Sequence, residues 1–462
     1  MRRRLSLAVL TGALAVAGCA AGPDYAPPAV EAGPAFHRAG EADAAMPSAR
    51  WWEGLGDPQL SALVERGLRD APTIAAAEAR VRQARAGLAA SRASLLPAVN
   101  ASALYLRGEL PDEALGGTSG SIDLFNLGFD AQWEADLWGG KQRAVERAQA
   151  QAGEASARLA DAQVSLSAEI ARTYVELRAR EAGIGLLDRR DAAEARLVTI
   201  ARSRLAGGTG TRQDLAMALE QAERTGAERA GVDAEASALR DALAVLTGAM
   251  PGTLDALAAG AVPLPPAQVS IGDPAAMLAR RPDVMAAERR LAAATAGVGV
   301  ERARRFPAVS LLGLIGIGGS SAGDVLDMSQ ISAIGLPRLS WSFLDFGRTA
   351  AAVRGAEAGR DAGLADYRAS VLGALQDAES ALARFGAARV GFSRAGQVAI
   401  HARERRRLDA MRAEAGTLPQ AMALATQRQA VDAELAETQA RARLALAYVA
   451  LAKSLGLGWV PG

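Results

Sequence analysis

Two long stretches without proline constrain the fold of this chain more than any other feature. No proline occurs between Pro111 and Pro251, or between Pro337 and Pro419. Both stretches are rich in Ala, Leu, Arg, Glu and Gln, with apolar residues three and four positions apart, as in amphipathic helices. Because proline interrupts a helix interior, its absence permits helices far longer than the usual length of about 8 to 20 residues.

Glycine-rich breaks divide each stretch into two helices. The predicted helices cover residues 140–206, 212–246, 347–414 and 420–455. The longest would extend roughly 100 Å at 1.5 Å per residue. Gly207-Gly208-Thr209-Gly210 separates the first pair, and Gly416-Thr417-Leu418-Pro419 separates the second. The sequence therefore predicts two long helical hairpins with coiled-coil packing.

The chain is internally duplicated. Residues 72–99 align with residues 282–309 without gaps, and 13 of the 28 positions are identical. Further along, Trp133 aligns with Trp341, and Gly208-Thr209 aligns with Gly416-Thr417. We predict two copies of one unit, over residues 51–262 and 263–462.

Each repeat contains a pair of candidate strands between its shorter and its longer helices. Apolar and polar residues alternate there, which indicates strands with one apolar face. The predicted strands cover about 98–107, 121–134, 308–318 and 330–343, joined by loops at 108–120 and 319–329. The repeat unit is thus helix, strand, strand and long helical hairpin.

Four such strands are too few to close a membrane barrel, because barrels begin at about eight strands and open edges are not tolerated in hydrocarbon. Several copies must then join if the strands cross a membrane. A soluble sandwich is the alternative, since alternation alone does not distinguish lipid from a core. Aromatic residues near the strand ends favour an interfacial girdle; they are Trp133, Trp138, Trp341, Phe343 and Phe346. We therefore predict a mainly α fold with a membrane β-barrel portion.

The amino terminus predicts export and lipidation. Met1 to Arg4 is basic, Leu5 to Ala17 is a mostly apolar stretch of 13 residues, and small residues precede Cys19. This pattern indicates a lipoprotein signal peptide over residues 1–18, with Cys19 acylated and residues 19–50 as a Pro- and Gly-rich tether. An ordinary secretory signal with an incidental Cys is the alternative.

Composition argues against several functional classes. The 52 basic and 51 acidic residues nearly balance, which disfavours nucleic-acid binding. One Cys and two distant His residues offer little for a disulfide framework, a metal centre or a catalytic relay. We predict neither an enzyme nor a catalytic, cofactor or metal site. The run Arg403 to Arg407 is interpreted as a solvated helix face or an intersubunit ion-pair surface.

Several motifs, in this order along the chain, carry a family resemblance. They are Trp51-Trp52, Asp57-Pro58-Gln59-Leu60, Leu96-Pro97, Trp133-Glu134-Ala135-Asp136-Leu137-Trp138-Gly139, Leu246-Thr247-Gly248, Arg280-Arg281-Pro282-Asp283, Phe306-Pro307 and Leu455-Gly456-Leu457-Gly458-Trp459. With them the chain resembles the outer-membrane factors of tripartite efflux pumps, the lipoprotein exit ducts of the OprM/TolC/NodT class. The resemblance covers essentially all of the chain after Cys19.

The resemblance implies a homotrimer with a 12-stranded barrel in the outer membrane and a periplasmic α-helical tunnel. It also implies that the protein catalyses no reaction. The expected partners are a periplasmic adaptor, an inner-membrane transporter of the resistance-nodulation-division (RND) type and outer-membrane lipids. Ala20, rather than Asp, follows Cys19, and this favours the outer membrane.

The resemblance also places a gate at the periplasmic tip, formed by turns at Gly207-Gly208 and Gly416-Thr417. Asp214 matches an acidic position of the family. Ala421 and Ala425 depart from it, because relatives carry Leu and Asp there. A helix N-terminal charge is the simpler interpretation of Asp214.

We consider three possible functions, beginning with the one that the sequence favours most. The first is an exit duct for drugs or small toxic compounds. The second is a duct of the same fold for metal export or type I protein secretion. The third is a structural coiled-coil envelope lipoprotein without a pore, which the duplicated strand pairs disfavour.

Overall fold

The structure is a computed structural model that describes residues 21–29, 32–39, 45–110 and 120–460. Cys19 and the predicted signal segment lie outside the described residues. The chain divides into two units, and we treat each by itself. The sheet unit holds the described residues among 1–29, 80–156 and 286–368, and the hairpin unit holds those among 30–79, 157–285 and 369–462.

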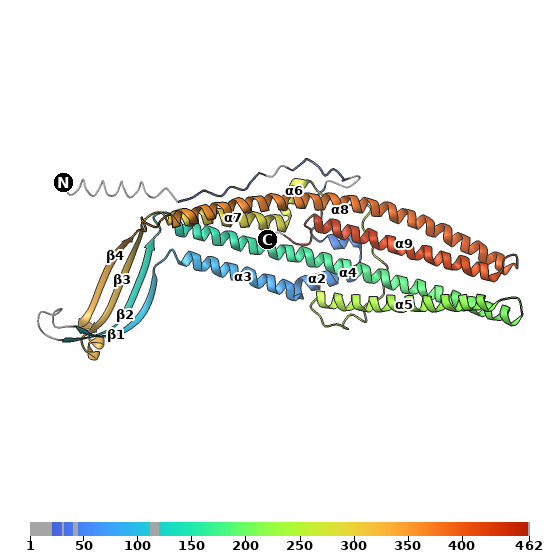
Figure 1. Ribbon diagram of the computed structural model, residues 1–462, viewed down its shortest axis with the longest axis horizontal. Coiled ribbons are helices and arrows are strands. Elements are labelled where there is room, and N and C mark those ends of the chain that lie inside the picture. The colour runs from blue at the N-terminus through green and yellow to red at the C-terminus, as the bar shows by residue number, and fades with distance from the viewer. Residues whose placement is uncertain (1–20, 30–31, 40–44, 111–119, 461–462) are drawn as a thin grey trace. The chain divides into compact units, whose positions relative to one another are not determined.

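The chain passes through the same series of elements twice (Figure 1). The first series is η1 (Trp51–Leu55), α2 (Pro58–Asp70), α3 (Pro72–Ala93), β1 (Ala98–Leu110), β2 (Gly120–Ala135), α4 (Gly140–Ala206) and α5 (Arg212–Leu246). The second is α6 (Pro274–Arg280), α7 (Pro282–Ala303), β3 (Ala308–Gly319), η3 (Ala322–Leu326), η4 (Met328–Gln330), β4 (Ile331–Ser340), α8 (Arg348–Glu414) and α9 (Gln420–Ser454).

Three pairs of corresponding helices have equal lengths, whereas α2 has 13 residues and α6 has 7. Helices α3 and α7 each have 22 residues, α4 and α8 each have 67, and α5 and α9 each have 35. The predicted mainly helical fold with two long hairpins and a β portion is confirmed.

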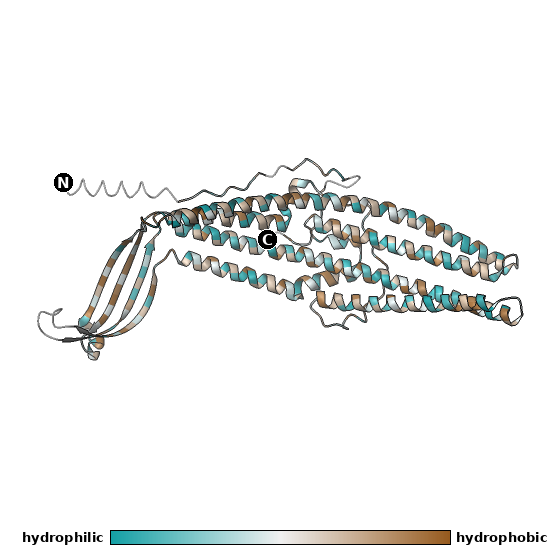
Figure 2. Ribbon diagram, viewed as in Figure 1, coloured by the Kyte–Doolittle hydropathy of each residue, from teal (hydrophilic) through white to brown (hydrophobic). Residues whose placement is uncertain are grey.

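The four strands form one antiparallel sheet in the order β1-β2-β3-β4. Phe129 pairs with Ala101 on one side and with Ile315 on the other, and Ile315 pairs in turn with Ala333. The Phe129 and Ile315 side chains are exposed, and Figure 2 shows hydrophobic residues recurring along the strands. One face of the sheet is therefore apolar and uncovered, and β1 and β4 are its two edges.

The fourth strand ends at Ser340, three residues before the predicted end at Phe343. Beyond it the backbone turns, with φ of +51° at Phe346 and +87° at Gly347. The Asp345 carboxylate then accepts a hydrogen bond from the Thr349 backbone N–H at 2.8 Å and so caps the start of α8. Phe343 therefore lies in the strand-to-helix connection, a boundary that alternation alone does not reveal.

The N-terminal segment 21–29 lies along the helices of the sheet unit. The Ala21 N–H donates to the Trp138 carbonyl at 2.8 Å, next to the junction of β2 and α4. Arg143 of α4 forms an ion pair with Asp24 at 2.6 Å. The Tyr25 hydroxyl donates to the Glu288 carboxylate of α7. These contacts fix the segment at a place two residues after Cys19.

The hairpin unit is built around α4. Asp57 caps α2 by accepting from the Gln59 and Leu60 N–H groups, and it also accepts from the Tyr174 hydroxyl at 2.6 Å. The fully buried Arg178 donates to Gln59 at 2.8 Å and lies 4.6 Å from the centre of the Tyr174 ring. A buried cation is stable here because hydrogen bonds and an aromatic face replace its water.

Across the described part of the chain, no helix combines the length and the apolar character needed to pass through a lipid bilayer.

Candidate functional site

The two hairpin turns have the same local geometry. After α4 the chain reverses at Gly208, where φ is +72°, and after α8 it reverses at Gly416, where φ is +71°. In each turn the following threonine donates its backbone N–H to a carbonyl five residues back. Thr209 reaches the Arg204 carbonyl at 2.8 Å, and Thr417 reaches the Arg412 carbonyl at 2.9 Å. Glycine is favoured at both positions because a positive φ strains other residues.

Asp214 lies in the first turn of α5, where it completes a capping box with Thr211. Its carboxylate accepts the Thr211 N–H at 2.9 Å, and its own N–H donates to the Thr211 hydroxyl at 3.1 Å. These hydrogen bonds hold the pKa of the Asp214 carboxyl below its usual range. The helix-capping interpretation of Asp214 therefore has a direct structural basis.

A cavity of about 260 Å³ near the first turn brings two of the candidate gate positions together. Asp214 of α5 and Ala421 of α9 both line it, whereas Ala425 is half-buried elsewhere on α9. Glu194 of α4 also lines the cavity. It is only 1% exposed, and its Oε1 atom has no hydrogen-bond partner. This atom forms an ion pair with Arg428 of α9, at 3.6 Å.

Ion pairs join α4 of the first hairpin to α9 of the second, farther from the turns. Arg189 pairs with the buried Glu434, and Arg190 reaches Asp432 at 3.4 Å. Arg190 also contacts Glu228 of α5 at 3.4 Å, so that this one side chain of α4 contacts two other helices. These contacts tie the two hairpins together below the tip.

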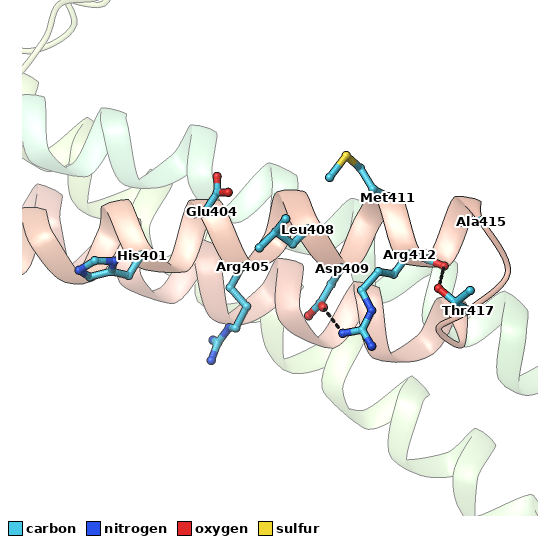
Figure 3. Close-up of a pocket in the computed structure, with 9 residues that line it drawn as sticks. All are labelled: His401, Glu404, Arg405, Leu408, Asp409, Met411, Arg412, Ala415 and Thr417. Carbon is cyan, nitrogen blue, oxygen red and sulfur yellow. Dashed lines mark hydrogen bonds and ion pairs between the residues drawn. The ribbon is translucent and has the colours of Figure 1, made fainter.

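A shallow groove of about 740 Å³ follows α8 up to its turn, as Figure 3 shows. Its walls are mixed, because Leu408 and Met411 lie beside charged side chains. Asp409 and Arg412, three residues apart on α8, pair along one side of it at 3.7 Å. The groove therefore offers both apolar contact and charge near the second turn.

Sequence reasoning missed the ties between the hairpins. The sequence predicts a solvated face or an intersubunit ion-pair surface at Arg403 to Arg407, whereas the ion pairs of Arg403 and Arg407 lie within one chain. In the structure Arg403 pairs with Glu437 of α9 at 3.1 Å, and Arg407 pairs with Glu404 on its own helix. Arg189 lies in the charged run Asp188 to Asp191, but nothing in the sequence pairs that run with Glu434, and only the three-dimensional arrangement brings the two residues together.

Comparisons with known proteins agree with this architecture. A family model described as "Outer membrane efflux protein" matches residues 63–249 and 274–457. The chain is 32% identical over 434 residues to the pyoverdine export outer membrane protein OpmQ of Pseudomonas putida, covering 90% of this chain and 89% of that protein. It is also 32% identical over 377 residues to the fusaric acid resistance protein FusA of Burkholderia cepacia, covering 77% and 69%.

A solved structure of the outer-membrane channel OprN aligns with 96% of this chain and all of that chain. The TM-score is 0.89 and the sequence identity is 31%.

Proposed function

We propose that three copies of this chain, which belongs to the outer membrane efflux protein family, build one exit duct. The members of this family are channels, and channels are not a class of enzymes. The duct is an outer-membrane efflux channel with a periplasmic helical portion. The observation that most directly supports this assembly is the sheet of four strands, which has two open edges and an uncovered apolar face. Open edges are not tolerated in lipid, and three copies would supply twelve strands, within the known range for closed barrels.

The duct receives its cargo from other proteins. A periplasmic adaptor and an inner-membrane transporter of the resistance-nodulation-division type would engage the tip formed by the two turns. The groove along α8, with its apolar and charged walls, supports contact with such a partner. Small organic compounds are the favoured cargo, because two relatives are named for fusaric acid resistance and pyoverdine export. Metal export and type I protein secretion are the alternatives.

Acylation at Cys19 would anchor each copy in outer-membrane lipid. The support is the position of Ala21, whose N–H is bonded to the carbonyl of Trp138 at the end of the sheet nearest the helices. An anchor two residues earlier would therefore start near the point where the strands leave the bilayer. Cys19→Ser should abolish labelling by a radioactive fatty acid, and continued labelling would contradict lipidation at this residue.

The tip lacks side chains that would narrow it at two positions. Ala421 lines the cavity beside Asp214, and neither Ala421 nor Ala425 carries a bulky or acidic group. We expect the Ala421→Leu, Ala425→Asp variant to have a lower basal conductance than the unmodified trimer in planar bilayers. Equal conductance would show that these positions do not limit the opening.

One experiment tests the proposed function as a whole. The full chain is extracted from outer membranes in detergent, its mass is measured, and it is reconstituted in a planar bilayer. A trimer that conducts ions supports the duct. A particle that gives no conductance under any applied voltage would favour a structural coiled-coil lipoprotein. Deletion of the gene, with the transporter still present, should also raise sensitivity to at least one organic toxicant.

A further inference from the structure

The two repeats make matching contacts at the helix end of the sheet. The Trp133 indole N–H, near the end of β2, donates to the Leu95 carbonyl before β1 at 2.9 Å. The aligned Trp341, just after β4, donates to the Arg305 carbonyl before β3 at 3.1 Å. Each repeat therefore closes its own strand pair with the same tryptophan bond.

A second contact joins the first repeat to the second, and only one copy of it exists among the described residues. Trp138, after β2, stacks on Phe306 with ring centres 4.6 Å apart. Its indole N–H donates to the Pro307 carbonyl at 2.7 Å. Both partners stand at the entry to β3, the strand next to β2 in the sheet. This contact seals the boundary between neighbouring strand pairs.

The matching groups of the other repeat have no such contact in the structure. Phe346 aligns with Trp138, and Leu96-Pro97 aligns with Phe306-Pro307. Phe346 follows the edge strand β4 and is 93% exposed, while Leu96 precedes the other edge strand β1 and is 67% exposed. Phe346 also has a positive φ of 51°, which no other non-glycine residue of the described chain has.

We propose that Phe346 of one copy packs on Leu96 and Pro97 of a second copy of this chain, where the edge strands β4 and β1 meet. This inference rests on the proposed oligomeric duct and adds the residues that seal its subunit boundary. Within one chain the pair cannot meet. Three strand spacings separate the two edges, about 14 Å at a spacing of about 4.8 Å. Phe lacks the indole N–H of Trp, and Leu96 stands where the first contact has Phe306, so the boundary between copies has an apolar contact without the hydrogen bond or the second aromatic ring.

Disulfide trapping tests the contact directly. Leu96→Cys and Phe346→Cys are introduced together in the full-length chain, and outer membranes are oxidised with copper phenanthroline. A disulfide requires Cα atoms within about 7 Å, so the cross-link must form between copies. We expect covalent dimers and trimers on a non-reducing gel. The two single variants are the matched controls, and they also report any cross-linking that involves Cys19.

The possible results separate the two proposals. A ladder seen only in the double variant supports the contact. Trimers by mass that give no ladder would overturn the contact and leave the duct proposal standing. A chain that is monomeric by mass before oxidation would overturn both. In addition, Phe346→Trp restores the residue of the first repeat. It should strengthen each subunit boundary about fivefold, as one added hydrogen bond of ordinary strength would, and so lower the dissociation constant of a trimer with three such boundaries roughly a hundredfold. An unchanged dissociation constant would contradict the proposed position of this side chain.

Discussion

Removal of the ion pair between Arg189 and Glu434 should make the duct open more often. The pair joins the first hairpin to the second, and its side chains are 46% and 10% exposed. Breaking a fully buried pair costs about 3–5 kcal/mol, and an exposed pair is worth about 0.2–1 kcal/mol. Because Arg189 is half in water, we expect an intermediate loss of about 1.5 kcal/mol in each subunit for Arg189→Ala. If the hairpins separate on opening, this loss shifts the closed-to-open equilibrium about tenfold for each subunit, and about a thousandfold for a trimer whose three subunits open together.

The assay is the open fraction of single trimers in planar bilayers, with a thermal melt of the same preparation. Arg224→Ala is the matched control, because Arg224 pairs with Glu220 inside α5 and both side chains are exposed. That change should cost no more than about 0.5 kcal/mol and leave the open fraction unaltered. If intact Arg189→Ala trimers open no more often than Arg224→Ala trimers, the pair does not hold the hairpins closed.

Three further predictions concern stability. Asp57→Ala should cost about 2 kcal/mol, because it removes both the cap of α2 and the acceptor for the Tyr174 hydroxyl. Asp273→Ala removes only the cap of α6 and should cost about 1 kcal/mol, so equal losses in denaturant melts would contradict the first prediction. Arg281→Ala should cost about 3 kcal/mol, since the buried Arg281 bonds to Asp283 and to the Ser454 carbonyl, and a melt unchanged from the unmodified chain would refute this. Burial alone would raise the pKa of the Asp283 carboxyl, but bonds from Arg281 outweigh it and hold the pKa below its usual range. The ionised Asp283 carboxylate therefore stabilises the folded chain above about pH 4, and this stabilisation is lost as pH falls through the lowered pKa. Asp283→Asn should for that reason flatten the fall in melting temperature below pH 4.

Helix ends in this chain follow from short-range chemistry, and the sequence predicts them closely. Gly208 and Gly416 adopt a positive φ that stops a helix, and proline-free composition sustains the 67 residues before each. Asp57 and Asp273 cap the helices that begin at the next residue. Each of these signals acts within about five residues, so no tertiary information is needed to interpret them.

The contacts that join separate elements were not predictable in this way. Glu434 and Arg189 are 245 residues apart, and any of several arginines on α4 could have faced α9. The docking of Tyr25 on Glu288 likewise depends on the packing of α4 and α7, which helical periodicity leaves open. The candidate gate illustrates the same limit: Ala421 faces the cavity and Ala425 does not, although both lie on the first turns of α9.

The N-terminal segment makes the two repeats unequal, and this affects the assembled duct. Tyr25 packs beside Ala292 and Ala293 of α7, whose short side chains leave space for it. The aligned positions of α3 are Arg82 and Gln83, both exposed and both long. A second segment of this kind could not lie on α3 in the same way, and each chain has only one. In a trimer, boundaries between repeats of one chain would therefore hold the segment 21–29, and boundaries between chains would not. Six similar repeats would then surround the channel with threefold rather than sixfold symmetry, and the Phe346 contact would carry a larger share of the sealing where no segment lies.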